Sequence, residues 1–391
     1  MLFGRSGCKR RVWINRGVTV TKTLILALMV ALVSVSPAGY GQVAGYQTPL
    51  DVPTDPRGVG MGESLVALRA NTSAIMYNPA GLAGLKGTSV AYTERKMNWF
   101  SPLEEFKYYG VNASVETPIG VFGARYDRFS MGVGSVQTNT PQGYTDVTTY
   151  QHDVILGFGT GIAGGLEVGA AAKYYDYVFA GSGGTESEIS AQLVSTTPAW
   201  LFDGGVLYTV PGLSAAGALV DELTFGVSLQ NVGTKIKYRW EGVSQSSDQP
   251  LPGYFHAGCA LKVGFPPAET AGPSLLTTTF TLEYTNLLNY TSDRVGGSAS
   301  WGAGLELVLG EIVSLRGGFV VRPVTSIYGE GGSVAYRYGT GVDLPLERLG
   351  IRIPLILSAE YSAIPLHDVG IGFLGPQRHT LDAFSFEVRM K

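Results

Sequence analysis

The chain has 391 residues, of which 45% are hydrophobic, only 15% are charged, and 54 are Gly. Soluble proteins carry about 25% charged residues, so this chain is poor in charge, and its mean hydropathy is +0.15. The 28 Lys and Arg residues are balanced by 31 Asp and Glu residues. This balance excludes a nucleic-acid-binding protein, because such proteins carry a basic surplus on one face.

The first 41 residues predict a secretory signal peptide. Residues 1–23 are basic with no acidic residue, and they lead into an apolar stretch at 24–35 and small residues at 39–41. An alternative translation start lies near Val18 or Val20. Beyond residue 36, no apolar run approaches the roughly 18 residues of a spanning helix, which excludes a helical membrane protein. Removal of Cys8 leaves Cys259 as the only cysteine, so no internal disulfide forms.

Residues 42–87 predict a compact segment rather than a strand. Positions 51–85 show no two-residue alternation, and the sequence GVGMG at 58–62 lacks the glycine spacing of a dinucleotide site. We expect a short helix over residues 64–69 and a turn at 78–81, where Asn and Pro favour such geometry. A Gly-rich segment ahead of a barrel is suited to fold into its lumen as a hatch, or plug.

From residue 88 onward, apolar side chains alternate with small, polar or charged ones, which is typical of strands with one apolar face. In residues 301–309, for example, Trp301 and Leu305 share a face that Glu306 does not. A soluble sandwich and a membrane barrel both produce this pattern. The fourteen expected strands cover residues 88–98, 106–116, 119–129, 147–160, 166–179, 199–209, 223–232, 253–264, 276–285, 298–309, 312–322, 333–343, 354–363 and 382–390.

The even number of strands and their length of about ten residues favour an all-β fold, a transmembrane antiparallel β-barrel occupying residues 88–391. Tight turns at 117–118 and 310–311 alternate with long polar connections at 131–147, 181–197, 241–252 and 323–332. Short periplasmic turns and longer external loops are the expected barrel pattern. We interpret the strand glycines Gly110 and Gly123 as marks of a bulge or bend in the wall.

The charged faces of the strands are expected to line the lumen. These residues are Arg125, Asp127, Glu167, Lys173, Glu283, Glu306, Arg316, Arg337, Asp343 and Glu360. Their mixed signs argue against an ion-selective porin, because selectivity needs a lining of one sign. They form either an internal network that anchors the plug or a polar path for a substrate.

No catalytic or metal site is expected, and no cofactor. The four His residues show no pair at ligand spacing, and no Gly-x-Ser-x-Gly nucleophile elbow is present. The two His-Asp neighbours, at 152–153 and 367–368, lie on strand-like segments whose adjacent side chains point to opposite faces. The sequence therefore predicts a protein that is not an enzyme.

Two groups of motifs carry a family resemblance. The run RGVGMGESLVA at 57–67, with residues 71–77 and the turn NPAGL at 78–82, resembles the hatch of the long-chain fatty-acid transporter (FadL) superfamily. Residues 203–208, 225–233 and Leu251-Pro252 resemble its PorV/PorQ branch. The resemblance implies a fourteen-stranded outer-membrane barrel with a ligand gate in the hatch. The gate residues would be Gly60, Gly62, Asn78, Pro79, Ala80 and Gly81.

The resemblance implies two functions. FadL-like members pass hydrophobic ligands through a gated barrel, whereas PorV-like members serve type IX protein secretion as outer-membrane adaptors. The leading interpretation is gated uptake of a hydrophobic small molecule by a barrel set in outer-membrane lipid. The alternatives are an adaptor that binds secreted or surface proteins through its external loops, and a structural barrel without cargo.

Overall fold

The computed structural model describes Leu50 and residues 54–96, 107–137, 144–182, 194–211, 220–240, 246–265, 275–288, 299–326, 329–366 and 379–390. The chain divides into two units, residues 1–39 and 40–391. All the described residues belong to the second unit, and only that unit is considered below. The predicted signal peptide lies outside the described residues.

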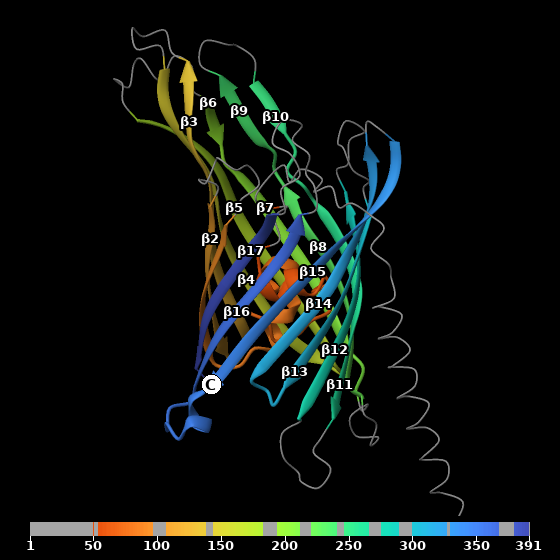
Figure 1. The fold of residues 1–391 in the computed structure, drawn as a ribbon. Coiled ribbons are helices and arrows are strands. Elements are labelled where there is room, and N and C mark those ends of the chain that lie inside the picture. Colours follow the sequence, from red (N-terminus) through yellow and green to blue (C-terminus); the bar gives the residue numbers. More distant parts are fainter. Residues whose placement is uncertain are drawn as a thin grey trace, which may run out of the picture. The chain divides into compact units, whose positions relative to one another are not determined.

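Fourteen antiparallel strands form a closed barrel (Figure 1). Every strand predicted from the alternation is present, and the predicted strand 199–209 matches β7 at both ends. In chain order the barrel strands are β1 (Thr88–Lys96), β2 (Lys107–Thr117), β3 (Gly120–Gln137), β4 (Tyr144–Ala163), β5 (Leu166–Ser182), β7 (Ala199–Thr209), β8 (Val220–Gly233), β11 (Tyr254–Phe265), β12 (Leu276–Leu287), β13 (Ala299–Leu309), β14 (Val313–Ser326), β15 (Gly329–Pro345), β16 (Leu355–Leu366) and β17 (His379–Met390). The wall closes where β1 pairs with β17.

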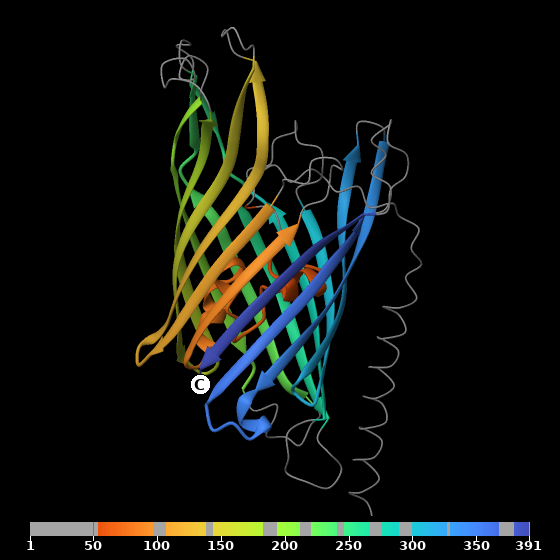
Figure 2. The same cartoon turned by 60° about the vertical axis from the view of Figure 1, so that its left-hand side comes forward.

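The two ends of the barrel differ in their connections. Tight turns join β2 to β3, β4 to β5 and β13 to β14 at one end, which is the periplasmic end in outer-membrane barrels. At the other end several strands project beyond their neighbours, as Figure 2 shows for β3 and β4 in yellow tones. The predicted loops 131–147 and 323–332 were therefore too long, since most of their residues extend the paired strands. Outside the bilayer a strand no longer needs apolar alternation, so the sequence pattern does not reveal these extensions.

A small second sheet stands at the same external end. It contains β6 (Val194–Thr197), β9 (Ile236–Trp240) and β10 (Ser246–Gln249), in the order β10-β9-β6. These strands fall within or beside connections that the sequence predicted to be loops. Four- and five-residue strands are too short to show a clear period, which explains why they were missed.

The two faces of the wall differ in polarity. Large apolar side chains point outward and are exposed, for example Trp301 at 50% and Phe386 at 60%. The opposite faces carry the charged residues and many of the glycines, and these are buried. A closed barrel satisfies its own backbone hydrogen bonds, and an apolar exterior suits hydrocarbon. The protein is therefore a transmembrane β-barrel of the bacterial outer membrane.

The wall bulges that were predicted at Gly110 and Gly123 are not there. The β2–β3 register is continuous through both residues, and register shifts occur instead at 130/133, 161/163, 202/204 and 262/263. Both glycines face the lumen, where other groups approach closely. A Cβ on Gly123 would lie 3.2 Å from Ile75 and Leu82, and one on Gly110 would lie 2.8 Å from Arg125. At both positions Gly allows another part of the protein to approach closely.

The described N-terminal residues form short helices: α2 (Pro56–Gly60), α3 (Ala74–Tyr77) and the 3₁₀-helix η2 (Pro79–Gly84). A further 3₁₀-helix, η4 (Leu346–Leu349), lies in the turn before β16. None of the described helices is long and apolar enough to cross a membrane. The helix predicted over residues 64–69 is wrong. The stretch forms a turn closed by Leu68 N–H to Leu65 O at 3.0 Å. Positive φ angles at Glu63 and Ala70, 59° and 54°, prevent a right-handed helix from extending beyond either border.

Candidate functional site: the plug and the barrel lumen

Residues 55–85, here called the plug, lie inside the barrel and are drawn in orange in Figures 1 and 2. The plug is held by backbone contacts, ion pairs and apolar packing at three regions of the wall. The predicted hatch boundaries at 42 and 87 stay a prediction, because residues 42–49 and 51–53 lie outside the described residues.

The first region is a backbone seat on β13, β14 and β15. Cβ atoms on Gly302, Gly304 and Gly318 would come closer to the backbone of Met61 and Gly62 than real Cβ atoms ever do. Gly62 has a φ of 65°, a conformation that favours Gly. Gly60 lies against Gly339 in the same way, with a Cβ-to-Cα distance of 3.2 Å. The plug therefore touches the wall through its backbone, at wall positions that carry no side chain.

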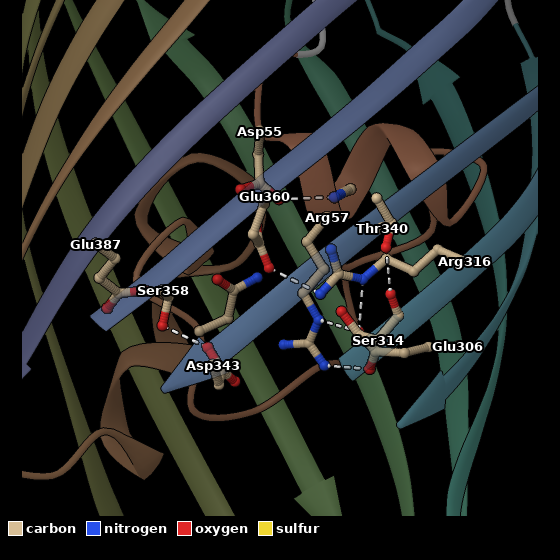
Figure 3. A network of polar contacts seen from close by, with 12 residues as sticks. Asp55, Arg57, Glu306, Ser314, Arg316, Thr340, Asp343, Ser358, Glu360 and Glu387 are labelled. Carbon is tan, nitrogen blue, oxygen red and sulfur yellow. Dashed lines mark hydrogen bonds and ion pairs between the residues drawn. The ribbon is translucent and has the colours of Figure 1, made fainter. Parts of the chain in front are cut away.

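Ion pairs surround this seat (Figure 3). Arg57 binds Glu306 in a bidentate pair, with Nη2–Oε2 and Nε–Oε1 distances of 2.7 and 3.0 Å. Arg316 bridges Glu306 and Glu360 at 2.7 Å each. A second pair joins Arg337 to Glu63 of the plug at 3.0 Å. Bidentate pairs fix orientation as well as charge, so this network sets the rotation of α2 against the wall.

The second region holds Val66 against β8, β11 and β12. Its N–H donates to Glu283 Oε2 at 2.8 Å, and its backbone lies against Gly226 of β8. The other oxygen of Glu283 lies 2.7 Å from His256 Nδ1. Glu283 therefore links the plug to two strands of the wall.

The third region centres on Asn78, which is fully buried. Its Oδ1 accepts from the N–H of Ala80 and caps η2. Its Nδ2 donates to Val66 O at 2.7 Å and to Val206 O of β7 at 3.2 Å. Pro79 and Ala80 lie against the backbone of Gly169. The proposed gate residues Gly60, Gly62, Asn78, Pro79, Ala80 and Gly81 thus all lie in the plug, in two separate contact regions, and their role as a gate stays a prediction.

An apolar cluster completes the third region. Ile75 and Leu82 pack with Val121, Ile155 and Ala171 of the wall. On the outer face of the same strands is a hollow of about 690 Å³. It is lined by the small and apolar residues Ala113, Val115, Phe122, Ala124, Leu156, Phe158, Ala170, Ala172 and Phe202, and also by Gly123 and Gly157. Because those two glycines also contact Ile75, only backbone separates Ile75 from the hollow.

The charged residues predicted for the lumen all lie on inward-facing wall positions. Arg125, Asp127, Glu167, Lys173, Glu283, Glu306, Arg316 and Arg337 are buried, and Asp343 and Glu360 are half-buried. Arg125 pairs with Asp127, and Lys173 pairs with Asp203, at 2.7 Å in each case. Arg69 of the plug pairs with Glu167, and this hydrogen bonding raises the pKa of Arg69.

Sequence reasoning did not identify several participants. Arg57 and Arg69 of the plug were not singled out, although they are the basic residues of that stretch. His256 shares the face of Gly258 and Ala260, so its two-residue spacing would have placed it in the lumen. The contacts between the luminal glycines and the plug could not be predicted, because no local sequence pattern shows which distant segment of backbone will lie against a glycine.

No family model and no curated protein matches the sequence. Among solved structures, the barrel is similar to the CymD monoaromatic hydrocarbon channel, with a TM-score of 0.50 and 10% identity over 87% of this chain and 98% of that one. The toluene transporter TodX of Pseudomonas putida has a TM-score of 0.48 and 11% identity over 85% and 97%. A FadL homologue of Pseudomonas aeruginosa gives 0.47 and 13% over 86% and 98%. At these identities the likeness shows the fold alone.

Proposed function

We propose that this protein is a gated channel of the FadL superfamily that carries small hydrophobic molecules across the outer membrane. The observation that carries the proposal is the wall patch between the plug and the outer hollow. Apolar plug residues lie on its inner side, an apolar hollow lies on its outer side, and Gly123 and Gly157 separate them. A hydrophobic molecule near Ile75 would therefore meet apolar surface on both sides of the wall.

The polar part of the lumen also favours this proposal. Beside the plug the wall carries Glu306, Arg316 and Asp343, and an apolar molecule gains nothing by entering such surroundings. One structure of similar fold is a monoaromatic hydrocarbon channel, so small apolar molecules are the first candidates to test. The adaptor function stays a prediction, because much of the external loops lies outside the described residues.

The experiment ties the plug to the wall patch through a reversible disulfide. A Cβ on Gly157 would lie 2.9 Å from Ile75 Cγ1, so cysteines at 75 and 157 bring their Cβ atoms to within about 4 Å, as a disulfide requires. We would make Ile75→Cys/Gly157→Cys with Cys259→Ala, so that the remaining native cysteine does not react. Uptake of radiolabelled toluene and of a long-chain fatty acid would then be measured in cells.

Oxidation of the double variant should reduce uptake to the level of cells without the protein, and a reductant should restore it. Ile75→Cys alone, with Cys259→Ala, serves as the control and should respond to neither reagent. Unchanged uptake after complete oxidation would contradict gating by the plug. If the wild-type protein carried neither probe, the transport proposal itself would be wrong.

A further inference from the structure

The connection between β15 and β16 exposes a cluster of large apolar side chains. We call residues 346–354, which contain η4, the η4 loop; Figures 1 and 2 show it in blue beyond the ends of the strands. Leu349, Ile351 and Ile353 are exposed by 63%, 43% and 50%. Single exposed aliphatic residues are common on proteins, but three within five positions mark a surface that contacts something else.

Backbone hydrogen bonds fix the shape of the η4 loop. Gly350 has a φ of 81° and donates to Glu347 O at 3.1 Å. Ile351 N–H donates to Leu346 O, also at 3.1 Å. These two bonds form the Schellman motif that ends many helices. Beyond the motif, Ile353 N–H donates to Ile351 O at 2.8 Å. The exposed side chains therefore project from a defined backbone.

The η4 loop is tied to the periplasmic rim of the barrel. Arg348 Nη1 donates to Gly310 O at 2.7 Å, and Arg348 Nη2 pairs with Glu311. Both partners belong to the tight turn between β13 and β14. Two cavities lie between the plug and the wall, and residues 346–354 line neither of them. The loop therefore belongs to the rim of the wall, where the membrane surface lies.

The apolar surface of the loop continues the lipid-facing surface of the wall. Leu344 of β15 and Leu357 of β16 are partners in the strand register, and both are exposed on the outer face. Ile353 precedes Leu357 by four positions, which span at most about 13 Å of extended chain. The apolar cluster of the loop thus begins close to a surface that faces hydrocarbon.

The charge of the loop suits a phospholipid surface. Residues 346–354 carry two Arg and one Glu. Arg348 is held by Glu311, whereas Arg352 is exposed and forms no ion pair with the described residues. A long basic side chain beside apolar residues can reach lipid phosphates while the apolar residues enter the edge of the hydrocarbon.

From these observations we propose that the η4 loop is an interfacial anchor. It inserts Leu349, Ile351 and Ile353 into the periplasmic leaflet and binds an anionic phospholipid headgroup through Arg352. A soluble partner or a second copy of the chain would also cover apolar side chains, but neither explains why the cluster continues the lipid-facing strands.

The anchor has a consequence for the plug. β15 begins the loop at one of its ends, and its inner face carries Arg337 and Gly339, which contact the plug. Lipid contact at the loop would therefore hold this part of the seat at a constant depth in the membrane. This role does not depend on which molecule the channel carries.

The test measures whether the side chains of the loop meet lipid or water. Spin labels would be attached to Leu349→Cys and to Ile353→Cys, each with Cys259→Ala, in protein reconstituted into vesicles of phosphatidylethanolamine and phosphatidylglycerol. Collisions with oxygen, which concentrates in lipid, would be compared with collisions with a water-soluble nickel chelate. Oxygen should dominate at both positions, as at the lipid-facing control Leu357→Cys, and the chelate should dominate at Lys86→Cys, an exposed position on the same rim.

Arg352 has its own test in the same vesicles. Arg352→Gln should lower the ratio of docked to free label at residue 353 by about fivefold, and Arg352→Lys should preserve the ratio. Vesicles without phosphatidylglycerol should lower the ratio of the wild-type loop to the same extent. An unchanged ratio in Arg352→Gln would overturn the assignment of the headgroup contact.

The labels also distinguish the other occupants. Dominant collisions with the nickel chelate at both loop positions in vesicles would overturn the proposal, and protection of these positions only in native membranes would then identify a protein partner. Spectral broadening by labels on neighbouring chains would place a second copy on the loop and would overturn the proposal as well. Because the labelled side chains are exposed, the substitutions leave the packing of the barrel intact.

Discussion

Gly304→Ala tests whether the plug depends on a backbone-to-backbone seat. The new Cβ would lie 2.8 Å from both the carbonyl carbon and the Cα of Met61, whereas ordinary contact begins at 3.4 Å. The plug backbone must therefore retreat by at least 3.4 − 2.8 = 0.6 Å, and two similar seats on Gly302 and Gly318 resist that retreat. Overpacking of this kind costs about 1–3 kcal/mol.

The assay is amide hydrogen exchange of peptides from residues 55–85 in detergent. A loss of about 1–3 kcal/mol should accelerate their exchange by roughly 5- to 150-fold, while the strands keep their protection. Gly317→Ala is the matched control, because a Cβ there meets nothing within 4 Å. If plug exchange in Gly304→Ala equals that in Gly317→Ala, the glycine seat does not hold the plug and the reasoning fails.

Three further predictions concern single contacts. Asn78→Ala removes the cap of η2 and leaves Val66 O unpaired, so it should lower plug stability by about 1–3 kcal/mol. Proteolysis in urea measures this loss, and unchanged cleavage would contradict the anchor role of Asn78. Glu306→Gln leaves Arg57 without its carboxylate partner and should lower the free energy of unfolding by about 3–5 kcal/mol. The exposed Glu116→Gln should change it little. Equal effects of the two variants would count against a buried network. Phe386 faces outward, so Phe386→Arg should lower stability in lipid vesicles by about 2–4 kcal/mol if the side chain meets hydrocarbon, whereas Phe386→Leu should not. Equal losses in the two variants would place residue 386 away from lipid.

The strands could be predicted because each one shows its alternation of apolar and polar residues within its own stretch of sequence. Successive side chains of a barrel strand point in turn to the lipid and to the lumen. The faces of residues such as Trp301 and Glu306 can therefore be assigned without knowing which strands lie beside them. The same alternation assigned the charged residues to the opposite face, where most of them are buried. It failed at strand ends beyond the bilayer and in the short strands of the external sheet, where no apolar face is required.

The contacts of the plug could not be predicted, since they join residues far apart in the chain. Arg57 and Glu306 are 249 positions apart, and nothing near either residue identifies the other. The role of Gly123 could not be predicted either. The sequence shows that a side chain is missing there, but not whether the backbone bends or another part of the same chain approaches. In place of the helix expected over residues 64–69 there is a turn, closed by Leu68 N–H to Leu65 O at 3.0 Å, and the sequence does not reveal the wall contacts that hold this stretch.

The pairing of β1 with β17 also has a consequence for biogenesis. The seam of the wall joins the first strand to the last, so the cylinder is complete only after the whole polypeptide has reached the membrane. The plug directly precedes β1 and is surrounded by strands from both halves of the chain. We therefore expect the insertion machinery to fold the wall around a plug that is already in place, and the pairing of β1 with β17 to form last.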